Sequence, residues 1–151
     1  MTQAMIQMQG IKKRYYEGKP NELEILHGID LQVYPGEFVA IVGESGSGKS
    51  TLMNIIGALD RPSEGSYVLD GINVSQARDD RLSAIRNKSI GFVFQNFNLI
   101  ARTNARKNVE LPMMYAGVPA ARRAARAREL LKMVGMADRM DHQPSELSGG
   151  Q

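Results

Sequence analysis

Residues 43–51 combine glycines, a lysine and hydroxyl side chains at the spacing of a phosphate-binding loop, G-x-x-x-x-G-K-[ST]. In such a loop the glycines let successive backbone N–H groups turn toward phosphate oxygens, and the following helix adds its unpaired N-terminal donors. Lys49 can neutralise the β- and γ-phosphates, and the Ser50 hydroxyl can ligate Mg²⁺. The specified positions coincide by chance about once in ten thousand sites or less, so we expect phosphate binding. The loop comprises Gly43, Glu44, Ser45, Gly46, Ser47, Gly48, Lys49, Ser50 and Thr51.

A dinucleotide-binding pattern does not fit, because Thr51 stands where the third glycine of G-x-G-x-x-G would be. A hydrolytic phosphate loop also needs a carboxylate at a strand end and a group that positions water. Asp70 follows apolar residues, but Gly71 after it indicates a hairpin turn, which makes Asp70 a weak metal candidate. Gln95 ends the apolar run "GFVF", and its amide can bind a metal or orient a water.

The elements around the loop follow the order strand, glycine loop, helix. Residues 38–42, "FVAIV", are continuously apolar after a Pro35-Gly36 turn, which predicts a strand covered on both faces. Residues 52–59 carry apolar side chains at helical spacing. Further strands are predicted over 4–16, 23–33, 66–69 and, buried again, 90–94, with a helix over 79–86. Two fully buried strands are too few for a stable sheet, so we expect exposed apolar surface.

The chain becomes helical after residue 95. Pro119 suits the first turn of a helix, and an apolar stripe closed by Gly135 follows it. The stripe consists of Ala124, Ala127, Leu131 and Val134.

Composition excludes several classes. The chain has 151 residues, 42% of them hydrophobic and 23% charged, as in an ordinary globular domain. Without cysteine it has no disulfide scaffold and no cysteine-based metal site. No apolar run is long enough to span a membrane, so we expect a cytosolic chain. Arginines and lysines cluster between 102 and 128, but without the aromatic platforms of a single-strand binder, so we expect no nucleic acid.

Four features occur in order along the whole chain: Tyr15, "GESGSGKST", "IGFVFQNFNL" with Gln95, and "LSGGQ" at the end. Together they resemble the ATP-binding cassette (ABC) transporter ATPases. The stretches "LMNIIGALDRPSEG" and "NVELPMMYAGV" are especially similar to the subfamily of macrolide exporters, lipoprotein-releasing transporters and cell-division ATPases. The resemblance implies an α/β fold, the P-loop NTPase fold of ABC type, with antiparallel β elements and an α-helical subdomain. It also implies ATP and Mg²⁺ as cofactors.

The resemblance implies roles by position. Tyr15 would stack on adenine, although the adjacent Tyr16 leaves that choice open, and residues 43–51 would hold the phosphates. Lys49 and Gln95 would be catalytic, with Ser50 and Gln95 at the Mg²⁺. The family's signature motif would meet the γ-phosphate held by a second ATPase domain in a head-to-tail dimer. It consists of Ser148, Gly149, Gly150 and Gln151.

The resemblance also implies an organisation and a location. Residues 1–95 would form the ATP-binding core and 96–151 the helical subdomain. A transmembrane permease subunit or a fused transmembrane domain would be the partner, at the cytoplasmic face of the inner membrane. ATP hydrolysis would power export or lipoprotein release. Ala101, Arg102 and Lys107 depart from the family's usual residues near the segment that faces the membrane subunits, which leaves the details of coupling open.

In the family, the magnesium-binding aspartate, the catalytic glutamate and the switch histidine all follow the signature, and this sequence has no residues there. We therefore expect an incomplete domain that binds ATP but hydrolyses it poorly or not at all, with a frayed signature. Two alternatives remain: a truncated, non-catalytic nucleotide-binding module, and a compact P-loop kinase that uses Asp70 as its metal residue.

Overall fold

The computed structural model describes residues 3–94 and 98–151. The chain divides into two compact units, of which unit 1 ends at Ile90 and unit 2 begins at Gly91. Gln95, which the sequence singles out, lies outside the described residues.

Unit 1 is built on an antiparallel sheet with the strand order β2-β1-β3-β4. The strands are β1 (Ile6–Tyr15), β2 (Leu23–Val33), β3 (Glu64–Leu69) and β4 (Ile72–Asn73). The strands predicted over 4–16, 23–33 and 66–69 are therefore confirmed. Asp70 and Gly71 both have positive φ angles, 47° and 75°, as a tight two-residue hairpin requires, which confirms the predicted turn.

A bulge bends β1 in its middle. From Met8 to Ile11, β1 advances one residue more than β2, and against β3 it gains the same extra residue. Gly10 (φ 58°) lies at the bulge, and its N–H donates to Asp30 Oδ1 at 2.6 Å. On the facing strand, a Cβ at Gly65 would lie 2.5 Å from the Gly10 carbonyl oxygen. Only glycine allows the two backbones to approach so closely.

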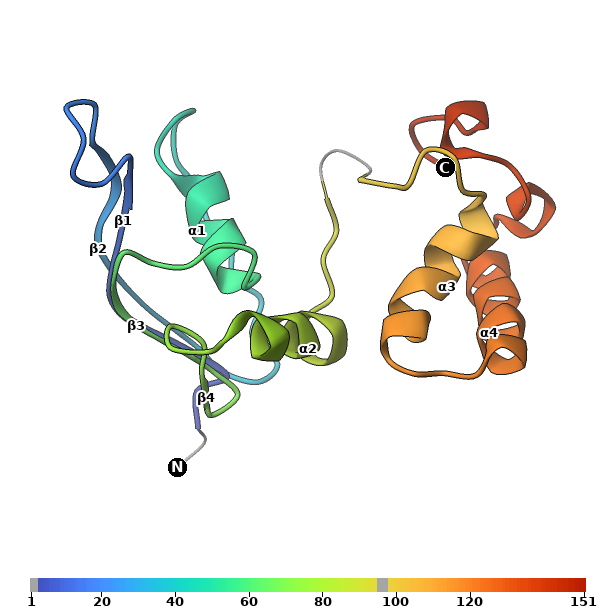
Figure 1. The fold of residues 1–151 in the computed structure, drawn as a ribbon, viewed down its shortest axis with the longest axis horizontal. Coiled ribbons are helices and arrows are strands. Elements are labelled where there is room, and N and C mark those ends of the chain that lie inside the picture. The colour runs from blue at the N-terminus through green and yellow to red at the C-terminus, as the bar shows by residue number, and fades with distance from the viewer. Residues whose placement is uncertain (1–2, 95–97) are drawn as a thin grey trace. The chain divides into compact units, whose positions relative to one another are not determined.

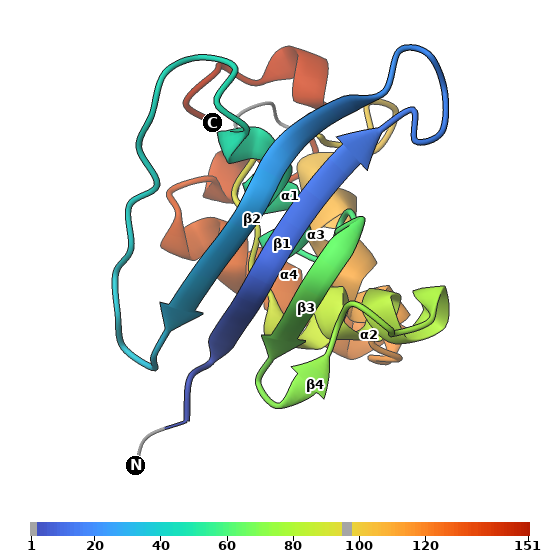
Figure 2. The same cartoon turned by 90° about the vertical axis from the view of Figure 1, so that its left-hand side faces the viewer.

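Two helices, α1 (Lys49–Ile56) and α2 (Asp79–Ser89), cover one face of this sheet (Figures 1 and 2). Both confirm predicted helices. Their buried residues, among them Leu52, Ile55, Leu82 and Ile85, join Met8, Ile11, Leu26 and Tyr67 of the strands in one hydrophobic core. The Tyr67 side chain is fully buried, and its hydroxyl donates to the Ile56 carbonyl at 2.7 Å. Burial raises the pKa of this phenol.

The strands predicted over 38–42 and 90–94 are wrong. Neither segment belongs to a β-ladder, and Phe38, Val42 and Val93 are 97%, 86% and 97% exposed. A strand needs a neighbour that pairs with its backbone, and none of the described residues supplies one to either segment. The expectation of exposed apolar surface is thereby confirmed.

Unit 2 is a helical hairpin of α3 (Ala105–Tyr115) and α4 (Ala120–Met133), followed by the short 3₁₀ turns η1 (Ala137–Arg139) and η2 (Pro144–Glu146). The predicted helical character is confirmed. Asn104 caps α3, because its side-chain oxygen accepts the Lys107 N–H at 2.9 Å. Pro119 stands at the N-cap of α4, just outside the first turn in which it was predicted.

The predicted apolar stripe is wrong at one residue, Val134, which follows the end of α4. Ala127 and Leu131 are buried, but Val134 is 69% exposed. Gly135 (φ 73°) ends the helix, and its N–H donates to the Lys132 carbonyl at 3.1 Å. The Met136 N–H donates to the Leu131 carbonyl at 2.8 Å. This Schellman pair of hydrogen bonds turns the chain so that Met136, and not Val134, packs on Leu131.

Candidate nucleotide-binding site

The phosphate loop opens α1 with its backbone donors free. Gly48 is the N-cap, no side chain caps this terminus, and the first turn holds no acidic residue. The helical ladder begins with the Leu52 N–H on the Gly48 carbonyl at 2.9 Å, so the N–H groups of Lys49, Ser50 and Thr51 precede it. Three donors and the positive end of the helix dipole therefore point at one place. This arrangement suits an anion such as a phosphate.

Gly48 is required by the packing of the loop on β2. Its φ is 88°, and a Cβ there would lie 2.9 Å from Leu26 Cδ2 and 3.2 Å from Ile25 Cγ2 and from the Ile25 carbonyl oxygen. A larger residue would collide with the core and with backbone together. The start of α1 is thus fixed against the sheet by the absence of a side chain.

The Lys49 ammonium lies inside the curl of the loop. Its Nζ donates to the Gly43 carbonyl at 2.8 Å, to the Glu44 carbonyl, and to Ser47 Oγ at 3.3 Å. These three acceptors are neutral oxygens. A phosphate would offer charged oxygens in their place, and charge-assisted hydrogen bonds are the stronger kind.

The rest of the loop is open to solvent. The exposed residues are Gly43, Glu44, Ser45, Gly46, Ser47 and Ser50, while Gly48, Lys49 and Thr51 are half-buried. The loop and the β1–β2 hairpin turn lie at the same end of unit 1 (Figures 1 and 2). The loop and the end of β1 thus lie on the same side of unit 1 (Figures 1 and 2).

Tyr15 ends β1 on the same strand face as Ile11 and Lys13, since alternate residues share a face. Ile11 is buried in the core under α1, so this is the face that α1 covers. The Tyr15 hydroxyl lies 3.4 Å from Asp60 Oδ2, and Lys13 Nζ lies 5.2 Å from the Tyr15 ring centroid. Tyr16 follows in the turn, 59% exposed, with φ 57°.

Sequence reasoning missed the charged residues that surround Tyr15. Lys13 Nζ donates to Asp60 Oδ1 at 2.6 Å and to the Arg61 carbonyl at 2.8 Å. The basic run Lys12-Lys13-Arg14 just before Tyr15 was the available signal. Its partner Asp60 is 47 residues away, and only the fold brings the two together.

Arg14, on the opposite face of β1, is the centre of a second set of ion pairs. Its guanidinium donates to Glu24 Oε2 at 2.8 Å and to Glu64, on the two strands that flank β1. Arg14 holds the pKa of both carboxyl groups below their ordinary value, chiefly through these hydrogen bonds. The three strands are thereby tied together near the end that carries Tyr15.

The signature residues Ser148–Gln151 belong to unit 2 and form a closed turn. The Gln151 N–H donates to the Ser148 carbonyl at 2.9 Å, and the Ser148 N–H donates to the Gln151 side-chain oxygen at 3.0 Å. These two hydrogen bonds close the turn, and fraying of the signature in solution stays a prediction. All four residues are exposed.

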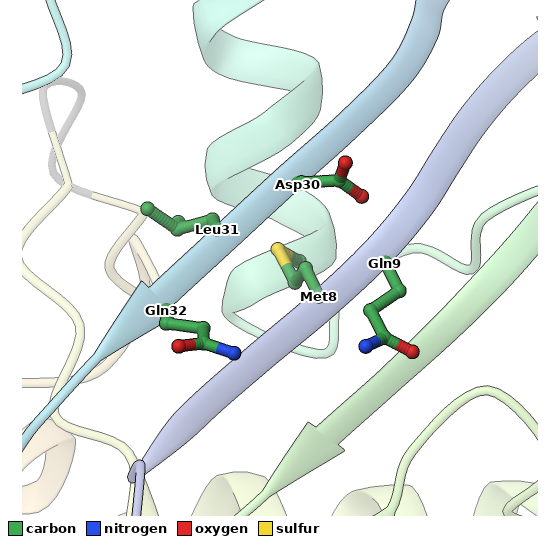
Figure 3. Close-up of a pocket in the computed structure, with 5 residues that line it drawn as sticks. All are labelled: Met8, Gln9, Asp30, Leu31 and Gln32. Carbon is green, nitrogen blue, oxygen red and sulfur yellow. The ribbon is translucent and has the colours of Figure 1, made fainter.

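A surface hollow elsewhere in unit 1 has a structural explanation. Met8, Gln9, Asp30, Leu31 and Gln32 line it along β1 and β2, and Figure 3 shows α1 passing behind these strands. Asp30 is already bonded to the Gly10 N–H of the bulge. The hollow lies beside the bulge and includes no residue of the phosphate loop.

No group of three or more acidic, histidine or cysteine side chains is arranged to hold a metal among residues 3–94 and 98–151. Within the same ranges, no helix has the length and apolarity to cross a bilayer.

A glycine loop that opens a helix beside a sheet, in a chain with a separate helical unit, defines a P-loop nucleotide-binding protein. The family model for the ABC transporter matches residues 26–151. The chain therefore belongs to the ABC transporter family, and the predicted fold class is confirmed.

Relatives and solved structures agree with this assignment. The chain is 56% identical over 147 residues to the Bacillus subtilis (strain 168) protein called Uncharacterized ABC transporter ATP-binding protein YknY, covering 97% of this chain and 64% of that protein. It is 52% identical over 147 residues to the Macrolide export ATP-binding/permease protein MacB of Nitrosomonas europaea, covering 97% of this chain and 22% of that protein. The dimeric structure of a post-hydrolysis state of the ATP-binding cassette MJ0796 bound to ADP and Pi superposes with a TM-score of 0.88 at 42% identity, over 97% of this chain and 65% of that chain. The chain thus spans less than two thirds of the length of each of these three proteins.

Proposed function

We propose that this chain is the nucleotide-binding part of an ABC transporter ATPase that powers export or lipoprotein release across the inner membrane. The single observation that carries the proposal is the start of α1, where three free N–H groups, the helix dipole and the Lys49 ammonium converge. The ligand is a nucleoside triphosphate, and ATP is the one that the family uses.

The residues present fit ATP. Gly48 packs so closely on β2 that no side chain could intrude at the first turn of α1, and the Lys49 ammonium already rests on oxygen acceptors. We propose that Lys49 exchanges those carbonyl oxygens for β- and γ-phosphate oxygens. Tyr15, on the α1 face of β1, is the better candidate for stacking on adenine than Tyr16, which lies in the turn beyond the strand.

Mg²⁺ would be held by the Ser50 hydroxyl and by Gln95. Ser50 stands exposed in the first turn of α1, next to the donors that would bind phosphate. Mg²⁺ commonly keeps several waters and binds few protein groups besides the phosphates, so one hydroxyl and one amide are a sufficient protein contribution. The metal would neutralise charge on the phosphates.

We further propose the organisation that the family implies. Residues 1–95 form the ATP-binding core and 96–151 the helical subdomain, whose signature Ser148–Gln151 contacts the nucleotide of a second ATPase domain. The partner in the membrane is a permease subunit or a fused transmembrane domain, and the ATPase lies at the cytoplasmic face. Support comes from the names of the relatives, one of which joins an ATP-binding part to a permease, and from the dimeric form of the solved cassette.

Catalysis by the 151 residues alone is proposed to be absent or weak, as in a binding module. The kinase alternative is disfavoured because Asp70 lies in the β3–β4 turn, at the opposite end of unit 1 from the phosphate loop (Figures 1 and 2).

Equilibrium ATP binding tests the proposal. The wild-type chain should bind ATP more tightly with Mg²⁺ than without it. Lys49→Met should weaken binding by about tenfold or more, the equivalent of one charge-assisted contact. Ser50→Ala should remove the Mg²⁺ dependence while retaining metal-free binding, and Asp70→Asn should change neither. Equal ATP affinity of the wild type and Lys49→Met would overturn the proposal. Kinase activity in the wild type that is lost in Asp70→Asn would favour the kinase alternative.

A further inference from the structure

The side chains of Lys13, Asp60 and Tyr15 form a cluster that joins the end of β1 to the segment after α1. Asp60 Oδ1 accepts from Lys13 Nζ at 2.6 Å, and Asp60 Oδ2 lies 3.4 Å from the Tyr15 hydroxyl. The ion pair is well sheltered, since the Lys13 side chain is 12% exposed and that of Asp60 31%. One carboxylate therefore contacts both neighbours at once.

Lys13 is held where it limits the freedom of the Tyr15 ring. Its ammonium is fixed by two acceptors, Asp60 and the Arg61 carbonyl at 2.8 Å. It lies 5.2 Å from the ring centroid, within the range of a cation–π contact. A cation on one face of the ring leaves the other face for a second planar group.

Asp60 is itself anchored to the helix that carries the phosphate loop. Its backbone N–H donates to the Asn54 carbonyl of α1 at 3.2 Å, and its side chain accepts the Arg61 N–H at 2.7 Å. The carboxylate thus has a fixed position relative to α1. Through Asp60, the Tyr15 ring on β1 has a fixed position relative to α1, whose N-terminal end would hold phosphate.

We infer that Asp60, acting through Lys13, is a positioning residue for base recognition: it orients the Tyr15 ring so that the ring can stack on the base of a nucleotide whose phosphates lie on α1. The inference rests on the proposed function, because it assumes that Tyr15 contacts the base. Asp60 touches no ligand in this arrangement. Its effect is on the affinity for the base and not on the affinity for phosphate.

The test compares ATP with inorganic tripolyphosphate, which carries the phosphates without a base. Both dissociation constants are measured for the wild-type chain, Asp60→Ala and the matched control Asp79→Ala. Asp79 Oδ1 accepts from Arg61 Nη2 at 2.6 Å, so the control removes an ion pair of the residue next to Asp60 and leaves the Lys13–Asp60 pair in place.

Asp60→Ala should weaken ATP binding about fivefold and leave tripolyphosphate binding unchanged, since the loss of a sheltered ion pair is at the upper end of the surface range. Asp79→Ala should alter neither. In a Tyr15→Ala background, Asp60→Ala should have no further effect on ATP. Lys13→Met should reproduce the selective loss, and it decides the matter if Asp60→Ala fails to fold.

Two outcomes overturn the inference. The first is full ATP affinity in Asp60→Ala, or in Lys13→Met if Asp60→Ala does not fold. The second is an equal loss of affinity for ATP and for tripolyphosphate. Failure of the proposed function has a different result. If the wild-type chain binds ATP no more tightly than tripolyphosphate, or Tyr15→Ala leaves the preference intact, then the base contact itself is wrong.

Discussion

Replacing Gly48 by alanine should destabilise unit 1 through two separable effects. A non-glycine residue in the left-handed region costs about 1–2 kcal/mol, and Gly48 has φ 88°. The added methyl would also lie 2.9 Å from Leu26 Cδ2, and overpacking a core costs about 1–3 kcal/mol. Leu26 is 3% exposed, and the Ile25 carbonyl oxygen, which is backbone, lies 3.2 Å from the same methyl. The sum is about 2–5 kcal/mol, a large part of the ~5–15 kcal/mol stability of a domain.

Gly46 provides the matched control. It has φ 83°, in the same loop, but nothing lies within 4 Å of its added Cβ. Gly46→Ala should therefore lose only about 1–2 kcal/mol, the backbone part. The assay is urea unfolding followed by near-ultraviolet circular dichroism, to which the tyrosines contribute, among them Tyr67, fully buried in unit 1.

A double variant sharpens the comparison. Leu26→Ala removes the atom that the new methyl would strike, so Gly48→Ala should cost less in that background than in the wild type, by about 1 kcal/mol or more. Equal urea midpoints for Gly46→Ala and Gly48→Ala, or strict additivity with Leu26→Ala, would refute the idea that close packing on β2 fixes the start of α1.

Three further predictions concern stability. Because Arg14 keeps the pKa of Glu24 and Glu64 below the ordinary 4.5, their ionised forms stabilise the fold above that pH, and the contribution is lost as the pH falls through the lowered values. The stability advantage of wild type over Arg14→Gln should thus shrink toward zero in acid, and carboxyl NMR titrations should show both pKa values rising in the variant. Asn108→Ala should destabilise unit 2 by about 1–3 kcal/mol, because its side chain bonds the loop before α3 at up to four backbone groups; amide exchange in that loop should accelerate. Tyr67→Phe should lower the thermal midpoint, at a cost of about 1 kcal/mol for the loss of the hydrogen bond to the partly buried Ile56 carbonyl.

The parts of the fold that could be predicted from sequence are those determined by local patterns. Turn residues with positive φ, such as Asp70 and Gly71, and the glycine loop before α1 have signals within a few residues of themselves. Strands β1 and β2 could be predicted from alternation, with the bounds of β1 off by one or two residues, but the bulge at Gly10 could not. A bulge requires knowledge of both neighbouring strands, which no single segment contains.

The failures share a different cause, which is dependence on a distant partner. An apolar run such as 38–42 predicts burial only if another element covers it, and Phe38 remains 97% exposed. Asp60 carried no signal of its own, since its contacts with Lys13 and Tyr15 cross from one end of the sheet to the segment after α1. Long-range pairs of this kind are invisible to periodicity.

The phosphate loop illustrates how these two cases combine. Its sequence predicts a strand before the loop and a helix after it. In the described residues only the helix side is packed against the rest of unit 1, through the contact of Gly48 with β2 and the backbone of α1. On the strand side, residues 38–42 have no ladder partner, and the Lys49 ammonium is the group that ties Gly43 and Glu44 back to the helix. Lys49 therefore has two roles that compete for the same atom, since a bound phosphate would take the ammonium from the carbonyl oxygens that it now joins. If residues 38–42 were paired in a sheet, Lys49 would no longer be needed to hold Gly43 and Glu44 against α1. We therefore expect a higher nucleotide affinity when that segment is paired.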